Sequence, residues 1–377
     1  MATTVPSKKK KMAIPAAADI ADDAPVLPVD LVYDILLRVP AKPLCRFRAV
    51  CPSWRSLLCD PTFIATHAAR HPSLLIAVAM ENTDTDVQIL DMSGNVVRRL
   101  KSGQQCLTDD MWTHHGLVFL KGKDGRHHVL DPATGDTSVL PDRPSQAYMY
   151  TVGWAAAAGE YKVLIIRDMD LHEEVCMVLS LGDKNHGWRE RGSPPAWVGR
   201  RGEVAVVRGI AYFLVSGIKC GWDDWIVAFD LELEAWRPAS IRGPMEEQDN
   251  PIYQSCVNLA EVHGHLVASV HKRSSDICVV ELWFLTDPHE PLWSKRYNIT
   301  LLPTTRDVFE SFGMPLQVLK DGRILVWIWK HYHKYRGVPR VYDPETETFT
   351  EGAASAGRRA VAGVYTGSLL RTVSALP

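Results

Sequence analysis

The chain has 377 residues, of which 46% are hydrophobic, and its formal net charge at pH 7 is -2. This length and composition allow a sizeable globular core and predict two or three domains. Because the net charge is close to zero, no global charge favours nucleic acid or an anionic membrane as a partner, and we expect neither.

The eight cysteines are scattered without a Cys-x-x-Cys pair, which predicts reduced thiols in an intracellular protein. The N-terminus has no apolar signal-peptide core, and no run approaches the roughly 18 apolar residues of a membrane span. We therefore expect the protein in the cytoplasm, the nucleus or both.

Residues 1–24 are rich in Ala, Lys, Pro and Asp and show no hydrophobic period, which predicts a disordered tail. Lys8 to Lys11 form a run of four lysines within it. Such a run can act as a nuclear-import signal, although an ordinary solvated tail is the favoured interpretation.

The region from Leu27 to Phe63 has the apolar spacing of short helices. Leu31, Ile35 and Leu36 lie at i, i+4 and i+5, so one side of the first helix is almost wholly aliphatic before Pro40 ends it. Helices this short are marginal alone, since a unit of under about 50 residues buries little surface. The region is therefore either a small cap on a larger domain or a docking module.

Two further helices are predicted in the same region. Pro43 and Pro52 each suit a first helical position, where no amide proton is needed. We expect Asp60-Pro61 to close the third helix, and we expect Phe47 and Trp54 to pack inside the module.

This region resembles the F-box. The matching residues are Leu27-Pro28, Asp30, Ile35-Leu36, Val39-Pro40, Leu44, Arg46-Phe47-Arg48, Val50-Cys51, Trp54 and Pro61-x-Phe63. Two positions depart from the pattern, since Val39 replaces the usual Leu and Pro52 the usual Lys or Arg. The resemblance implies docking on Skp1 and, through it, on a cullin. By motif position, the contact residues are Leu27, Pro28, Leu31, Ile35, Leu36, Val39, Pro40, Leu44 and Val50.

From Ser73 onwards, short β-rich runs replace the helical spacing. One recurring phrase joins two strands through a turn that begins with Asp, as in HHVLDPATGDTSVLP from His127, and another has a Gly turn, as in VAVVRGIAYFLV from Val204. The unit repeats at roughly 40 to 57 residues, which is typical of a propeller blade. We expect an all-β propeller-like domain of about six blades, with the run from Ala360 to Thr372 completing the first. A pair of two-sheet sandwiches is the alternative.

The β region also resembles the F-box-associated and kelch-like propellers of plants. The resemblance rests on the phrase from His127 and on the aromatic-Gly-Trp stretch from Tyr150 to Asp168. Together the two resemblances imply a small all-α F-box followed by the propeller. The expected divisions are a tail at 1–24, the helical module at 25–66, a linker at 67–72 and the β domain at 73–377.

No phosphate-binding loop, dinucleotide fingerprint, Gly-x-Ser-x-Gly elbow or His-Glu-x-x-His pattern is present. Residues two apart in a strand share a face, so His263 with His265, and His331 with His333, can each offer two imidazoles to a metal. No Cys or carboxylate completes either set at ligand spacing. We therefore predict no metal, no cofactor and no catalytic residue.

Acidic residues framed by aromatic ones can line a binding mouth, and aromatic residues are enriched at interface hot spots. On this ground the candidate target contacts are Trp222, Asp223, Asp224, Trp225 and Tyr332. The favoured plain interpretation is that the tryptophans belong to the core of a blade beside a polar turn.

The leading hypothesis, from the two resemblances, is a substrate-recognition adaptor of an SCF-type ubiquitin ligase, with the F-box on Skp1 and the β domain on a target protein. Such an adaptor performs no chemistry, because it acts by raising the concentration of a target lysine near a ubiquitin-charged enzyme. One alternative is a propeller hydrolase, which requires convergent carboxylates or a metal set in the central channel. Another is an F-box scaffold that acts without ligase assembly.

Overall fold

The structure is a computed structural model. It describes residues 27–39, 41–70, 75–80, 86–90, 96–101, 106–114, 117–122, 126–131, 137–142, 144, 147–170, 173–181, 187–198, 204–215, 225–245, 256–273, 278–287, 291–301, 311–330, 337–350 and 359–365. The tail at residues 1–24, with its lysine run, lies outside these ranges. No helix within them is long and apolar enough to cross a bilayer.

The N-terminal helices are α1 (Val29–Leu36), α2 (Ala41–Phe47), α3 (Pro52–Leu58) and α4 (Pro61–Arg70). The expectation of three helices is wrong by one, because Asp60-Pro61 starts α4 instead of ending the helical region. Oδ1 of Asp60 accepts hydrogen bonds from the backbone N–H groups of Thr62 (2.8 Å) and Phe63 (3.0 Å). Proline at the first position and an aspartate before it are favourable helix-start residues. Helix α4 also continues through residues 67–70, where the sequence predicts a linker.

The helices share a small core of their own. Its buried members are Leu36, Leu37, Leu44, Leu58, Phe63 and Ile64. Phe47 and Trp54 pack against this core as expected, with their ring centroids 5.6 Å apart. The His67 ring hydrogen-bonds through Nε2 to the carbonyl oxygen of Val39 (2.8 Å), which ties α4 to the end of α1.

The described strands form six antiparallel sheets. From the first strand outward, they are β25 (Arg359–Tyr365), β1 (Leu75–Met80), β2 (Asp86–Leu90) and β3 (Val96–Lys101); β4 (Cys106–His114), β5 (Leu117–Gly122), β6 (His127–Leu130) and β7 (Thr137–Val139); β8 (Ala147–Ala155), β9 (Glu160–Asp170), β10 (Glu173–Ser180) and β11 (Arg189–Glu190); β12 (Val204–Val207), β13 (Ile210–Leu214), β14 (Trp225–Asp230), β15 (Ala235–Trp236) and β16 (Ile241–Arg242), which also pairs with β14; β17 (Cys256–Val262), β18 (His265–Arg273), β19 (Cys278–Asp287) and β20 (Leu292–Leu301); and β21 (Ser311–Val318), β22 (Ile324–Lys330), β23 (Gly337–Asp343) and β24 (Thr348–Thr350).

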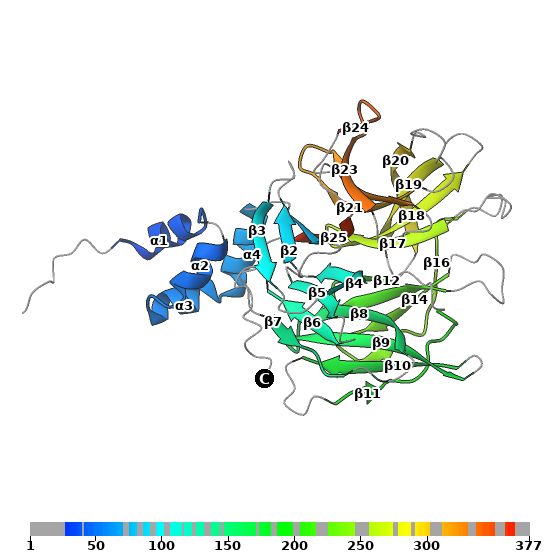
Figure 1. Ribbon diagram of the computed structural model, residues 1–377, viewed down its shortest axis with the longest axis horizontal. Helices are drawn as coiled ribbons and strands as arrows, with labels where there is room; N and C mark the ends of the chain where they lie inside the picture. The colour runs from blue at the N-terminus through cyan, green and yellow to red at the C-terminus, as the bar shows by residue number, and fades with distance from the viewer. Residues whose placement is uncertain are drawn as a thin grey trace, which may run out of the picture.

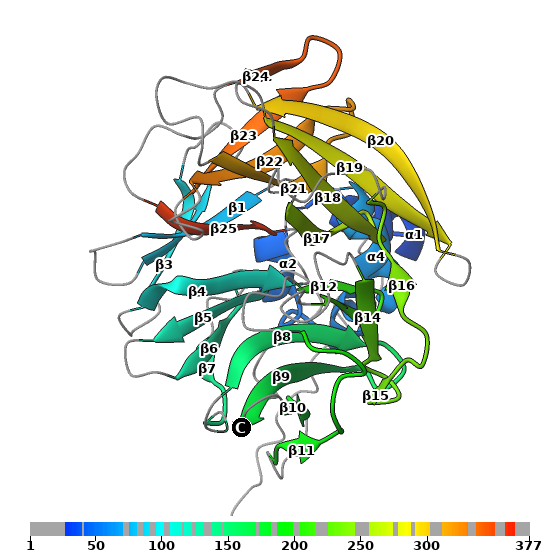
Figure 2. The ribbon, with the colours of Figure 1, turned by 90° about the vertical axis from the view of Figure 1, so that its right-hand side faces the viewer.

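These sheets form a propeller. The first strands of neighbouring sheets touch one another, as β25 touches β4 and β17 touches both β12 and β21. Figure 2 shows the sheets arranged around a common centre. This arrangement excludes the alternative of two sandwiches, because a sandwich has no ring of first strands.

The blade count needs one correction. Five sheets are built from consecutive strands, so the described residues form five blades that are continuous in sequence, where about six blades were expected. The remaining sheet is composite, because β25 pairs antiparallel with β1, placing Tyr365 opposite Leu75 and Val364 opposite Ile76. The C-terminal strand thus completes the sheet of β1 to β3, and this pairing closes the ring.

The sheets bury both of their faces against neighbouring sheets. On β14, Ile226 and Ala228 belong to the core shared with the β17–β20 sheet, while Val227 and Phe229 belong to the core shared with the β8–β11 sheet. Successive side chains point to opposite faces of a strand, so a strand between two blades is apolar at nearly every position. The sequence WIVAFD from Trp225 has this composition for that reason.

Turns that begin with Asp have the same geometry in two blades. Oδ1 of Asp230 accepts hydrogen bonds from the N–H groups of Glu232 and Leu233, and Oδ1 of Asp343 does the same for Glu345 and Thr346. A carboxylate that satisfies two backbone donors stabilises a tight reversal. This local bond explains why an aspartate stands at the start of both turns.

The β8–β11 and β12–β16 sheets are joined by a cluster of charges. The Glu234 carboxylate contacts Lys162 Nζ (3.0 Å), Arg189 Nη2 (2.7 Å) and Arg191 Nε (2.6 Å). Burial raises the pKa of Glu234, but the hydrogen bonds from Arg189, Lys162 and Arg191 outweigh it and lower the pKa to about 2. Glu234 also has a positive φ of 50°. Its carboxylate is the acceptor that holds three cations together at this blade boundary.

We predict that Glu234→Gln destabilises the propeller by about 1 to 3 kcal/mol, because charge-assisted hydrogen bonds are lost while three cations remain together. The folded-state pKa lies below the ordinary 4.5, so the contribution of Glu234 is present above pH 4.5 and is lost as the pH falls towards 2. Urea unfolding at pH 7 measures the loss. Glu190→Gln, at an exposed residue of β11 in the neighbouring β8–β11 sheet, is the matched control. Equal stability of the two variants at pH 7 contradicts the prediction.

His271 on β18 is a buried titratable group at another blade boundary. Its side chain is 2% exposed, and Nε2 lies 3.2 Å from Asn258 Nδ2. Burial lowers the pKa of His271 to about 4, although a hydrogen bond with the backbone of Gly313 in the next sheet opposes this shift.

We predict that His271 makes the protein less stable as the pH falls. The unfolded chain takes up a proton near pH 6.5 and the folded chain only near pH 4, so stability falls between these values by up to about 3 kcal/mol. Chemical denaturation at pH 7, 5.5 and 4.5 measures this slope. In His271→Gln, which keeps a polar group beside Asn258, the slope over this range decreases. An unchanged slope means that other groups cause it.

The helical module lies over one face of the propeller. In Figure 1, α4 lies nearest the strands and α1 farthest from them. In Figure 2, which is turned by 90°, α2 and α4 lie behind the middle of the ring. The two views place the helices over the face of the ring and not at its rim.

Candidate functional site

The candidate site is an exposed apolar surface on the helices, which we call the docking surface and define as Leu27, Pro28, Leu31, Ile35 and Val50. Leu27 is 54% exposed, Leu31 and Ile35 are each 50% exposed, and Val50 is 62% exposed. Residues four apart lie on the same side of a helix, so Leu31 and Ile35 form one stripe along α1, while Leu27 and Pro28 precede the helix. Val50 lies in the turn between α2 and α3. Apolar side chains gathered in this way favour a protein partner that removes them from water.

The structure buries some of the contact residues expected from the sequence and leaves others exposed. Leu36 is 1% exposed and Leu44 is fully buried, and both belong to the core of the module itself. We therefore remove these two from the contact set, because a partner cannot reach them without opening that core. Val39 is half-buried, and Pro40 lies outside the described residues.

Val29 was missed by the sequence analysis, although it is 74% exposed. It is the first residue of α1 and lies off the stripe of residues four apart. Its position at a helix start, with no preceding turn to cover it, is the only signal in the sequence.

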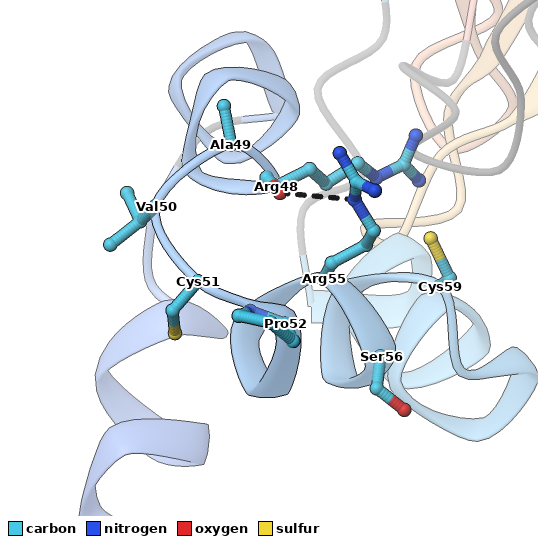
Figure 3. Close-up of a pocket in the computed structure, with 8 residues that line it drawn as sticks. All are labelled: Arg48, Ala49, Val50, Cys51, Pro52, Arg55, Ser56 and Cys59. Carbon is cyan, nitrogen blue, oxygen red and sulfur yellow. Dashed lines mark hydrogen bonds between the residues drawn. The ribbon is translucent and has the colours of Figure 1, made fainter.

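An open pocket of about 560 Å³ borders the docking surface. Its lining residues are Arg48, Ala49, Val50, Cys51, Pro52, Arg55, Ser56 and Cys59. Arg48 donates through Nη2 to the carbonyl oxygen of Leu58 (3.1 Å), and Arg55 donates through Nε to the carbonyl oxygen of Arg48 (3.4 Å). Figure 3 shows the two arginine side chains on one side of the α2–α3 turn and Val50 on the other. From the sequence, Arg48 was expected only as a motif residue, and Arg55 was not expected at the site.

Of the expected target contacts, only Trp225 lies within the described residues. It is the first residue of β14 and is 39% exposed. Trp222, Asp223, Asp224 and Tyr332 lie outside the described residues, so the expected grouping with Trp225 stays a prediction.

Topology places Trp225 on the face away from the helices. Strand β1 follows α4 in the chain and is second in its sheet, so it leads away from the helices. Strand β13 has the equivalent second position in its own sheet, and blades of a propeller repeat the same strand directions. The end of β13 and the start of β14 therefore lie on the far face.

The histidine pair at the turn between β17 and β18 does not converge on a metal position. His263 occupies a tight turn with a positive φ of 52°, while the His265 ring contacts Phe284 at 6.3 Å between centroids. Among the residues that the structure describes, no group of three or more His, Cys, Asp or Glu side chains can hold a metal ion. His331 and His333 lie outside those residues.

Comparison with known proteins identifies both parts of the chain. Residues 25–66 match the F-box domain, and residues 74–358 match the F-box associated beta propeller domain. Three similar proteins come from Arabidopsis thaliana. F-box protein At1g67130 is 22% identical over 348 residues, which cover 85% of this chain and 71% of that protein. F-box/kelch-repeat protein At4g19930 is 26% identical over 330 residues, which cover 77% of this chain and 73% of that protein. F-box protein At5g65850 is 27% identical over 292 residues, which cover 72% of this chain and 70% of that protein. Since the propeller match alone covers well over half of the chain, this protein belongs to the family of plant-type F-box proteins with an F-box-associated β-propeller domain.

Proposed function

We propose that this protein is the substrate-recognition adaptor of an SCF-type ubiquitin ligase. In this proposal the F-box docks on a Skp1-like protein and, through it, on a cullin, while the propeller holds a target protein for ubiquitination. The protein itself is a non-catalytic subunit, and we propose that it acts in the cytoplasm, the nucleus or both.

The exposed docking surface is the single observation that carries this proposal. A soluble protein that shows several large aliphatic side chains on one small module gains free energy when a partner covers them, at about 25 cal/mol for each Å² of apolar area. The helical core is small, with six buried members, so a partner also stabilises the module. These are the properties of a docking element.

The arrangement of the two domains supports the division of labour. The docking surface includes α1, which is the helix farthest from the propeller, so a large partner can approach it (Figure 1). Trp225 lies on the opposite face of the propeller. A target held on that face is kept at a fixed position relative to the rest of the assembly, which raises its effective concentration near the ubiquitin-charged enzyme.

Co-purification with a Skp1-like protein and a cullin tests the proposal. We expect the full-length protein to retain both, and we expect a Leu27→Ala/Pro28→Ala double variant to lose them. If the wild-type protein retains neither, the adaptor proposal is wrong. If it retains Skp1 but the half-life of a captured target is unchanged when residues 25–66 are deleted, the F-box acts as a scaffold outside the ligase.

A further inference from the structure

The helical module carries a positive charge that the whole chain does not. Residues 27–70 contain six Lys and Arg residues and three Asp residues, for a net charge of +3, whereas the chain as a whole carries -2. Two of the three acidic residues are engaged within the module, since Asp60 caps α4 and Asp34 lies 3.8 Å from Arg70. The partner of this module therefore meets a basic surface.

Two of these cations, Arg48 and Arg55, line the pocket described above, and no carboxylate lines it with them. None of the eight residues that line the pocket is acidic. Arg48 uses Nη2 and Arg55 uses Nε to reach backbone carbonyl oxygens, and neither guanidinium forms an ion pair with the described part of the chain. Nε of Arg48 is buried and has no hydrogen-bond partner there. Arg48 therefore keeps one buried donor without a partner in this part of the chain, and the exposed Arg55 has donors beyond Nε that a partner can use.

Arginine donors are arranged to bind a carboxylate through two parallel hydrogen bonds. The pocket is open to solvent along its rim, Arg55 is exposed, and the lining between the arginines and Val50 is largely apolar. A side chain that enters it needs an acidic head and an apolar stem or neighbour, as Glu and Asp in a helix of a partner provide.

We infer that the Arg48–Arg55 pocket receives a carboxylate side chain of the Skp1-like protein that docks on the helices. This inference rests on the proposed function and adds to it the chemistry of the contact. Val50 connects the two sites, because it lines the pocket and also belongs to the docking surface. The apolar stripe supplies most of the affinity, and the arginine pair sets the register of the partner and accelerates encounter with an acidic surface.

Titration of full-length protein with a purified Skp1-like protein tests the inference. We expect Arg55→Glu to weaken binding at least tenfold, because the variant places a carboxylate against the partner's own. We expect Arg48→Lys to weaken it less, since the charge remains but the two-bond geometry is lost. We also expect the affinity of the wild-type protein to fall as NaCl rises from about 50 to about 200 mM. The fall in affinity is expected to be smaller for Arg55→Glu.

Arg46→Glu is the matched control, because it makes the same charge change at an exposed position of α2 outside the pocket. We expect its affinity for the Skp1-like protein to fall by about threefold or less. Replacing the partner's matching acidic residue with Lys restores the affinity of Arg55→Glu. Thermal unfolding of each variant is measured beside wild type, and an unchanged profile is expected because the substitutions leave the module folded.

The outcomes separate the two proposals. If the wild-type protein binds and Arg55→Glu binds within twofold of it, the arginine inference is wrong while the adaptor proposal stands. If Arg46→Glu is as damaging as Arg55→Glu, diffuse charge replaces the pocket as the explanation and the inference is again overturned. If the wild-type protein does not bind at all, the proposed function fails, and this inference fails with it.

Discussion

Leu31→Gln/Ile35→Gln is expected to reduce the affinity for a Skp1-like protein about 100-fold, which corresponds to about 3 kcal/mol. Burying a Leu or Ile side chain fully is worth roughly 1.5 to 3 kcal/mol, and both residues start half-exposed on α1. Gln has a similar length, carries no charge and suits a helix. The variant therefore removes the apolar contact without adding repulsion. Calorimetric titration measures the change.

The same substitutions leave the protein folded, because neither side chain belongs to the buried core of the module. We expect its unfolding free energy to stay within about 0.5 kcal/mol of wild type, as for other surface changes. Leu233→Gln/Leu292→Gln is the matched control, since these leucines are 76% and 59% exposed on the propeller. Full affinity of the α1 variant, or equal loss in the control, would show that the stripe is not the contact.

Deletion of residues 359–377 is expected to abolish the cooperative folding of the propeller. The deletion removes β25, which pairs with β1 and contacts β4, so the sheet of β1 to β3 loses its first strand and the ring opens. Strand β1 then presents an unpaired edge, which promotes association between chains. We expect the free energy of unfolding to fall by more than about 4 kcal/mol, a size that is already exceptional for a single substitution.

A chain that ends at residue 366 is the control, because it keeps β25. We expect this shorter deletion to elute as a monomer and to unfold in one transition, while the longer deletion elutes in the void volume or is insoluble. Size-exclusion chromatography and thermal unfolding distinguish the two. A chain without residues 359–377 that unfolds within a few degrees of wild type would mean that β25 does not close the ring.

Local patterns in the sequence were enough to predict most of the architecture. The Asp turns and the apolar runs are local features, so they predicted hairpins, and their spacing predicted a propeller. The closing strand was also expected, although its partner β1 lies nearly 300 residues away, because an incomplete blade at one end requires a strand from the other. The sequence did not predict where the helical region ends. Asp60-Pro61 suits a stop and a start equally, and only the hydrogen bonds of Asp60 to Thr62 and Phe63 distinguish them.

The sequence by itself determined that α1 is rich in aliphatic residues and that its motif is that of an F-box. It did not determine which aliphatic residues face a partner. Leu31, Ile35 and Leu36 are adjacent on the helical surface, and a sequence pattern treats them alike. Packing of α3 and α4 against one side of α1 buries Leu36 and leaves Leu31 and Ile35 in solvent. Likewise, only the tertiary structure brings Arg48 and Arg55 into one pocket without a carboxylate, because the charges that surround a side chain depend on neighbours from other helices.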